Sequence, residues 1–191
     1  MKLIKKATET EKIARSSNIN DGIYVVPAFS GMGAPYWRPD ARGLITGLGT
    51  PYWNAKSRGV LSGLTRDTGI KEIVRATVES VAYQTYDLFN AMNKDGLKPR
   101  IVKIDGGMVA NNWFSQFLSD TINLKVIRPK VLETTALGVA LFAGYQVGEF
   151  KSLNQIKNIW QKDKAFSPKI KNSLRNQLLQ GWKLAIRKTL A

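Results

Sequence analysis

The sequence contains no cysteine and no histidine among its 191 residues. It therefore has no disulfide framework and no thiolate, and it lacks the commonest general base and metal ligand. These absences exclude zinc-type sites and Ser–His–Asp catalysis within the chain. No apolar run approaches the roughly 20 residues that a membrane-spanning helix needs, and the first residues lack the apolar region of a signal peptide. We therefore expect a cytoplasmic protein without a membrane partner.

Acidic residues are scarce: 14 Asp and Glu stand against 29 Lys and Arg, which gives a formal net charge of +15. Such an excess is typical of proteins that bind nucleic acid. The basic residues are, however, spread along the chain, and their densest region, Lys151–Lys188, has the pattern of the solvated face of a helical tail. No nucleic-acid-binding module is recognisable, so nucleic acid stays an alternative partner that this pattern disfavours.

The most informative stretch is Ile101–Asn112. It begins with four strand-forming residues, continues through Asp105 and Gly106–Gly107, and can start a helix at Asn111. A strand, a glycine turn and a helix N-terminus together bring bare backbone N–H groups close to a ligand, because glycine has no Cβ in the way. A phosphate or the polar edge of a base suits such a site. The alternative is a plain strand-to-helix turn, in which the glycines serve only the backbone angles.

Strands and helices alternate along the chain, which predicts an α/β domain. The predicted strands are Ile23–Phe29, Ile101–Asp105 and Leu124–Ile127, and the predicted helices are Met1–Ser17, Ile70–Asn93, Asn112–Thr121, Val131–Gly148 and an amphipathic last helix after Pro168. We expect the aromatic face of Asn112–Thr121 to lie in the core. Small residues on Val131–Gly148 predict that this helix packs against the sheet, and the last helix is expected to dock on the outside of the domain.

A unit of the sequence is repeated. Gly33–Leu48 is followed by a near copy, Gly49–Leu64, in which Pro, Tyr, Trp, Arg and the glycines recur at an offset of about 16 residues, below the usual range for solenoid repeats. One copy is enough to form one loop and one strand. The other copy must therefore bulge out of the fold or displace the first one. The second copy runs directly into the long helix. We therefore predict that the second copy is native at its C-terminal side and that the first copy keeps the loop at its own start.

Several motifs carry a family resemblance, and they run along nearly the whole chain: Val26–Trp37, Arg75–Thr85, Asp105–Asn112, Arg128–Lys130 and Glu133–Gly138. In these motifs the sequence closely resembles the C-terminal domain of the glycerol kinases, within the FGGY carbohydrate kinase family. The resemblance implies the ribonuclease H-like C-terminal half of the actin/hexokinase/Hsp70-like ATPase fold, followed by a C-terminal amphipathic helix. It covers only about the C-terminal two-fifths of such an enzyme.

The same resemblance implies a division of the chain into three segments. Residues 1–22 correspond to a helical connection left from the interdomain region. Residues 23–150 correspond to the nucleotide-binding domain, with the tandem duplication at 33–64 inside it. Residues 151–191 correspond to a basic helical extension of that domain.

The resemblance also implies which residues bind a nucleotide. The adenosine part of ATP would lie against a Gly-Gly-x-x-x-Asn element, where Gly107 lets the backbone approach and Asn111 can donate and accept hydrogen bonds. Gly106 and Met108 would line the same wall, and Asp105 lies there too, away from the position of a catalytic base. No catalytic residue and no metal ligand is implied in this chain. The phosphate turn, the glycerol site, the base and the Mg²⁺ ligands would belong to an N-terminal half.

Three hypotheses follow. The chain is the ATP-binding part of a glycerol kinase, a phosphotransferase that forms sn-glycerol 3-phosphate and ADP from glycerol and ATP in glycerol catabolism. It would then be inactive alone and would need a separately encoded N-terminal half. Alternatively it is a decayed, non-functional remnant, as the duplication and a start inside the enzyme would suggest. The third hypothesis is the basic nucleic-acid-binding module, whose binding would fall steeply with salt.

Overall fold

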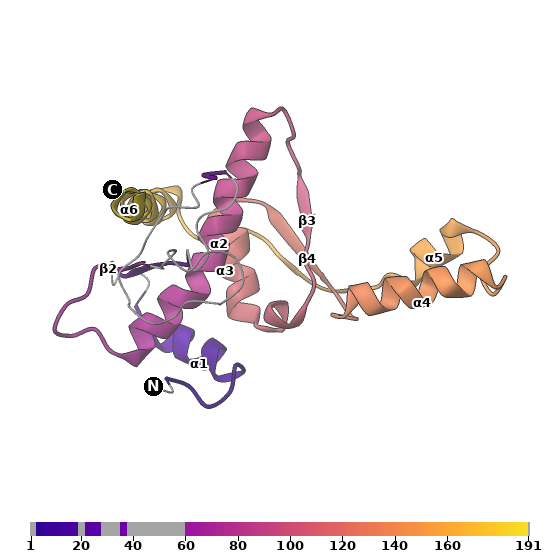
Figure 1. Cartoon of the computed structure of the whole chain (residues 1–191), viewed down its shortest axis with the longest axis horizontal. Coiled ribbons are helices and arrows are strands. Elements are labelled where there is room, and N and C mark those ends of the chain that lie inside the picture. The colour runs from indigo at the N-terminus through magenta and orange to yellow at the C-terminus, as the bar shows by residue number, and fades with distance from the viewer. Residues whose placement is uncertain (1–2, 19–21, 28–34, 38–59, 191) are drawn as a thin grey trace.

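The computed structural model describes residues 3–18, 22–27, 35–37 and 60–190 of the chain. Figure 1 shows the order of its elements along the chain. They are α1 (Glu9–Ser16), β1 (Tyr24–Val26), β2 (Val60–Ser62), α2 (Ile70–Lys94), β3 (Ile101–Lys103), the 3₁₀ turn η1 (Gly107–Ala110), α3 (Asn112–Ile122), β4 (Lys125–Pro129), α4 (Thr134–Gln146), α5 (Leu153–Ile159), β5 (Lys162–Phe166) and α6 (Asn172–Leu190). None of these helices has the length and apolarity that crossing a bilayer requires.

Two small sheets organise the described residues. β1 and β2 pair antiparallel, with Val25 opposite Leu61. In the other sheet the order is β3-β4-β5; β3 and β4 run parallel, and β5 is antiparallel to β4. Parallel neighbours need a crossover connection, and α3 provides it between β3 and β4. The α/β class predicted from the alternating pattern is confirmed.

Caps fix the ends of the two long helices that precede and follow β3. The N–H of Gly69 donates to the Glu72 carboxylate at 2.8 Å, which closes the start of α2. The side chain of Asn111 accepts the N–H of Phe114 at 2.9 Å and starts α3. α3 ends at Asn123, whose φ of 56° lies in the left-handed region. Because each end has a local cause, both helices begin and end within a residue of the positions expected from the sequence.

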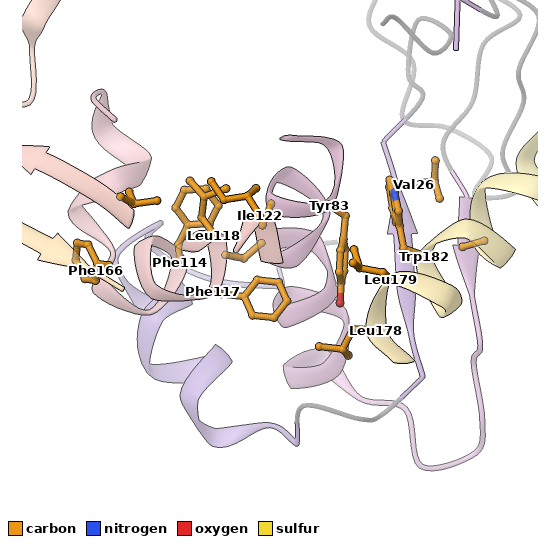
Figure 2. Packing of buried hydrophobic residues seen from close by; sticks show 14 of the residues in the cluster. Val26, Tyr83, Phe114, Phe117, Leu118, Ile122, Phe166, Leu178, Leu179 and Trp182 are labelled. Carbon is orange, nitrogen blue, oxygen red and sulfur yellow. The ribbon is translucent and has the colours of Figure 1, made fainter. Parts of the chain in front are cut away.

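The core is built around aromatic rings that α2, α3 and α6 bring together (Figure 2). Trp182 of α6 is fully buried and stacks on Tyr83 of α2, with 5.3 Å between the ring centroids. Phe117 of α3 meets Tyr83 edge-on at 5.6 Å. The indole N–H of Trp182 donates to Asp87 at 2.6 Å, which satisfies two buried polar groups at once. The prediction that the aromatic face of α3 lies in the core is confirmed for Phe114 and Phe117.

The C-terminal tail differs from the expectation. The sequence predicted only helices after Phe150, whereas Lys162–Phe166 forms β5 and pairs with β4. The last helix was expected to dock on the outside, yet Leu178, Trp182 and Ile186 of α6 belong to the core. The reason is that the apolar side of α6 packs on β1 and on Tyr83 of α2. β5 and α6 are thus part of the packed domain.

α4 also differs from the expectation. It was predicted to lie against the sheet, but none of its residues is buried. Figure 1 shows α4 and α5 projecting together beyond the ends of β4 and β5, away from the helices of the core. The small residues of α4 therefore do not pack on this sheet. Gly144 instead lies against the ring of Phe150, where a Cβ would come within 2.8 Å of that ring.

The repeated unit contributes at both of its outer ends. Val60–Ser62, from the second copy, forms β2 beside β1. Tyr36, from the start of the first copy, packs against the core. The other residues of the repeat, Gly33–Ala34 and 38–59, lie outside the described residues.

Candidate functional site

The turn after β3 has the geometry that the glycine motif predicted. Ile104 donates its N–H to the carbonyl of Ile127 in β4 at 3.0 Å, which keeps the chain in the sheet up to the turn. Gly106 then takes φ 87° and ψ 171°, a combination that essentially only glycine adopts. Its N–H donates to the carbonyl of Leu132 at 2.9 Å. The first glycine therefore sets the direction in which η1 leaves the sheet.

The N-terminus of α3 is already occupied by groups of the protein. The side-chain oxygen of Asn111 accepts the N–H of Phe114 at 2.9 Å, and a carboxylate oxygen of Glu11 accepts the N–H of Asn112 at 3.1 Å. The amide nitrogen of Asn111 also donates to the hydroxyl of Thr10 at 3.4 Å. A ligand at η1 would consequently meet the turn itself and the remaining hydrogen-bonding capacity of Asn111, rather than an uncapped helix end.

Glu11 is the charged group of this corner. Its burial raises the carboxyl pKa, but hydrogen bonds from Arg15 and from the backbone of Asn112 outweigh that effect, and the net pKa is lowered. The guanidinium of Arg15 lies 2.7 Å from the Glu11 carboxylate. A carboxylate at a helix N-terminus is favourable because the helix dipole places partial positive charge there. Glu11 thus ties α1 to α3 and holds α1 beside η1.

A cavity of about 540 Å³ lies between α1, α2 and η1. This volume is within the range of small-molecule sites, roughly 300–1,000 Å³. Its walls mix apolar and polar side chains and comprise Ala7, Thr8, Thr10, Glu11, Thr77, Val78, Val81, Gly107, Met108, Ala110 and Asn111. Of the four residues predicted to bind a nucleotide, Gly107, Met108 and Asn111 line this one cavity, and Gly106 shapes the turn behind it.

The second glycine of the pair is not needed by the fold. Gly107 has no positive φ, and a Cβ built on it would meet no atom within 4 Å. Any small residue could therefore stand there as far as the described structure is concerned. Beside it, the side chain of Met108 is 42% exposed. Because Gly107 has no side chain and the thioether of Met108 beside it is exposed, a planar ring can approach the backbone closely here.

The sequence did not point to Arg128, which holds η1 in place. Its guanidinium donates to the carbonyl oxygens of Val109 at 2.8 Å and Ala110 at 3.2 Å. The same group is paired with Asp163 of β5, with 2.6 Å between the nearest atoms. In the sequence Arg128 belonged to one of the motifs that carry the family resemblance, directly after a predicted strand, but no contact was predicted for it. Its partner comes from a strand that the sequence did not predict, so no local pattern could have revealed the contact.

The described part of the chain contains no group of three or more Asp or Glu side chains that could hold a metal ion. The residues present therefore do not fit a resident divalent cation, and the cavity at η1 is lined by one carboxylate only.

The comparisons with known proteins all indicate the same protein family. The model of the FGGY family of carbohydrate kinases, C-terminal domain, matches residues 46–147. The chain is 45% identical to a glycerol kinase of Alteromonas mediterranea over 186 residues, which are 97% of this chain and 34% of that protein. It is also 45% identical to glycerol kinase 1 of Pseudomonas aeruginosa, over 98% of this chain and 35% of that one. The chain thus spans about a third of the length of these relatives.

Solved structures agree with this assignment. The crystal structure of Plasmodium falciparum glycerol kinase with ADP matches 99% of this chain and 35% of its own, with a TM-score of 0.79 and 33% identity. A ligand-bound xylulose kinase from Lactobacillus acidophilus matches 98% of this chain with a TM-score of 0.71 at 20% identity, which supports the fold alone. The predicted actin/hexokinase/Hsp70-like kinase fold is confirmed by these neighbours.

Proposed function

Because the chain belongs to the FGGY family of carbohydrate kinases, we propose that it is the nucleotide-binding C-terminal part of a glycerol kinase. The ligand of the cavity at η1 would be the adenosine end of ATP or ADP. The relatives that match nearly the whole chain are glycerol kinases, and one similar structure contains ADP. Glycerol, as the acceptor of the phosphoryl group, is taken from those names.

One observation carries the proposal: Gly107 lines the cavity although nothing in the fold requires glycine there. A glycine without a positive φ and without crowding costs backbone entropy for no structural gain. That cost is explained if a ligand must lie against the backbone itself. Gly106 differs from Gly107 in this respect, because its φ of 87° by itself explains why a glycine stands at that position.

The residues around Gly107 suit a nucleoside. Met108 and Val81 offer apolar surface for a planar base, and the amide of Asn111 keeps one N–H and one oxygen lone pair beyond its contacts with Phe114 and Thr10. Thr77 provides a further hydroxyl on the α2 side. Binding of a base and sugar positions ATP but does not transfer its phosphoryl group. The chain alone is therefore proposed to bind a nucleotide without catalysing the reaction.

Catalysis would require the remainder of the enzyme. The groups that hold glycerol, the phosphates and Mg²⁺, and the base that takes the hydroxyl proton, are proposed to lie in polypeptide that this chain does not span. That polypeptide would be an N-terminal partner of the chain. Only the combination would carry out phosphoryl transfer to glycerol, in the cytoplasm.

The test is titration of the purified chain with ADP, followed by ligand-detected NMR or calorimetry. Gly107→Ala adds a methyl group in open space, so the free energy of unfolding should stay unchanged while ADP affinity falls about tenfold, which corresponds to about 1.4 kcal/mol. Gly138→Ala is the matched control, since Gly138 is equally uncrowded and belongs to α4, which projects away from α1 and α2 (Figure 1) and contributes no residue to the cavity. Equal ADP affinity of both variants and the wild type would contradict the proposed contact. No ADP binding by a folded wild-type chain would favour the remnant hypothesis.

A further inference from the structure

α1 forms part of the wall of the cavity at η1, but it buries little of itself against the core. Ala7 and Thr8, just before α1, and Thr10 and Glu11 within it line the cavity. Among the eight residues of α1, all of which the structure describes, only Ala14 is buried. A helix of this length is not stable by itself in water. The position of α1, and with it the shape of the cavity, therefore depends on the contacts that α1 makes with its neighbours.

Arg75 of α2 binds the C-terminal end of α1, which lies beside the first turns of α2 (Figure 1). One nitrogen of its guanidinium donates to the carbonyl oxygen of Ala14 at 3.2 Å and also to that of Ser17. These carbonyl groups belong to the last turn and the C-cap of α1, where a helix leaves its carbonyl groups without partners in the helix. Because the helix dipole places partial negative charge at this end, a cation is favourable there. Arg75 thus holds one end of α1, while Glu11 ties the other end to α3.

The guanidinium of Arg75 is itself held by α2 and α3. Its Nε donates to the carboxylate of Glu79 at 2.7 Å, and both of these charged residues are buried. Its central carbon lies 5.0 Å from the centroid of the Trp113 ring, in the first turn of α3. Because a guanidinium is planar and its donors point in fixed directions, Glu79 and Trp113 determine where the bonds to α1 can form. Arg75 therefore contacts three elements around the cavity without lining the cavity itself.

We propose that Arg75 is a positioning residue of the nucleotide site, because it holds α1 in the place where α1 completes the cavity at η1. This inference rests on the proposed function. If α1 left this place, the cavity would lose the wall that contains Thr10 and Glu11, and the bond from the Asn111 amide to Thr10 would break. The nucleotide then binds only the form in which α1 is docked, and its apparent Kd rises as the docked fraction falls. Docking of α1 and binding of ADP strengthen each other by the same factor.

The first test compares ADP binding by Arg75→Lys and by a matched control, Arg175→Lys. Arg175 of α6 also donates to a helix carbonyl, that of Thr121 at 2.9 Å, and also lies over a ring, 5.7 Å from the centroid of Tyr86. Both substitutions keep the positive charge and remove the planar set of donors, but Arg175 has no contact with α1 among the described residues. We expect the Kd for ADP to rise at least about tenfold in Arg75→Lys and to stay within about twofold of the wild type in Arg175→Lys. Equal affinity of Arg75→Lys and the wild type would overturn the proposal, and so would equal losses in the two variants.

Hydrogen exchange of the backbone amides separates a positioning role from a purely structural one. Without ADP, the amides of α1 should exchange at least about tenfold faster in Arg75→Lys than in the wild type, while those of α6 exchange at an unchanged rate. Saturating ADP should slow the exchange of α1 again, because the nucleotide favours the docked form. Faster exchange in α6 as well would mean that Arg75 only stabilises the domain as a whole. Normal exchange of α1 together with weakened ADP binding would show that the effect does not pass through α1. Either of these results would overturn the proposal.

A second variant displaces α1 while leaving Arg75 in place. The side chain of Ala14 is fully buried but does not belong to the core cluster of the described residues. Ala14→Gln should therefore push α1 away from α2 without opening that core, and it should weaken ADP binding and speed the exchange of α1 as Arg75→Lys does. Lys12→Gln, at an exposed position of the same helix, is the control and should bind ADP like the wild type. Normal ADP affinity of Ala14→Gln, with α1 shown to exchange faster, would overturn the proposal.

The same measurements distinguish failure of this proposal from failure of the proposed function. If the folded wild-type chain binds no ADP, the nucleotide site fails, and the role of Arg75 toward a nucleotide fails with it. If the wild type binds ADP and both Arg75→Lys and Ala14→Gln bind it equally well, the nucleotide site stands and only the positioning role of Arg75 is overturned.

Discussion

Replacing Trp182 with Phe tests how the C-terminal helix is joined to the core. Trp182 is fully buried, and its indole N–H donates to Asp87 over 2.6 Å. Loss of a hydrogen bond to a charged group costs about 1.5–3 kcal/mol. The phenyl ring has three fewer heavy atoms, worth roughly 2 kcal/mol of burial at 0.8 kcal/mol per methylene. We therefore expect the free energy of unfolding to fall by about 4 kcal/mol.

The hydrogen-bond part of that sum is measured by a double-mutant cycle with Asp87→Ala, because an asparagine oxygen could still accept the indole N–H. Urea unfolding is followed by far-ultraviolet circular dichroism, because the substitution itself changes the fluorescence. The coupling energy of Trp182 with Asp87 should be about 1.5–3 kcal/mol. A coupling energy below about 0.5 kcal/mol would refute the reasoning, since the two residues would then contribute independently.

The pH dependence gives a second readout of the same pair. Burial raises the pKa of Asp87, although hydrogen bonds from Trp182 and Tyr36 act to lower it. The folded pKa therefore exceeds the unfolded value near 3.8, and the folded state binds more protons between the two. The free energy of unfolding should consequently fall as pH rises through this interval. Comparison of the wild type with Asp87→Asn isolates this contribution, and Trp182→Phe should extend the interval upward because it removes one of the lowering hydrogen bonds.

Four other substitutions probe the surroundings of the candidate site by urea unfolding. Arg75→Ala should lower the free energy of unfolding by about 3–5 kcal/mol, since it breaks a buried ion pair with Glu79 at 2.7 Å. Arg15→Ala breaks an exposed ion pair and should lower it by less than about 1 kcal/mol. Similar losses for the two variants would contradict the role given to burial. Gly106→Ala should cost about 1–3 kcal/mol because of its φ of 87°, and an unchanged stability would show that the turn relaxes. Glu11→Gln should cost about 0.5–1 kcal/mol at neutral pH. Because the pKa of Glu11 is lowered in the folded protein, the stability difference between Glu11→Gln and the wild type should disappear as pH falls through that lowered pKa. A stability difference that persists in strong acid would show that the charge of Glu11 is not its cause.

The sequence predicted those parts of the fold that have local causes. The periodic apolar residues of α2 and the cap at Asn111 define helices whatever surrounds them. The strand-glycine-glycine motif likewise placed Gly107, Met108 and Asn111 together, and they do line one cavity. That these residues bind a nucleotide stays a prediction.

What the sequence could not predict depends on contacts between distant residues. β5 has a basic, unpatterned sequence, and its place in the sheet follows from pairing with β4 and from the contact of Asp163 with Arg128. The stripe on α6 predicted a buried face but not that this face would meet Tyr83, which lies about a hundred residues earlier. For α4 the small residues predicted packing against the sheet, and this prediction is wrong, because none of the residues of α4 is buried.

The candidate site lies at the border between the packed and the uncovered parts of the molecule. η1 is held from the packed side by Arg128, whose guanidinium binds two of its carbonyl groups, and by Glu11 at the start of α3. On the other side, Gly106 donates to Leu132, in the short segment that leads from β4 into α4. The strand that leads into η1, β3, is the edge strand of its sheet among the described residues. The supports of this wall of the cavity therefore come from within the chain itself.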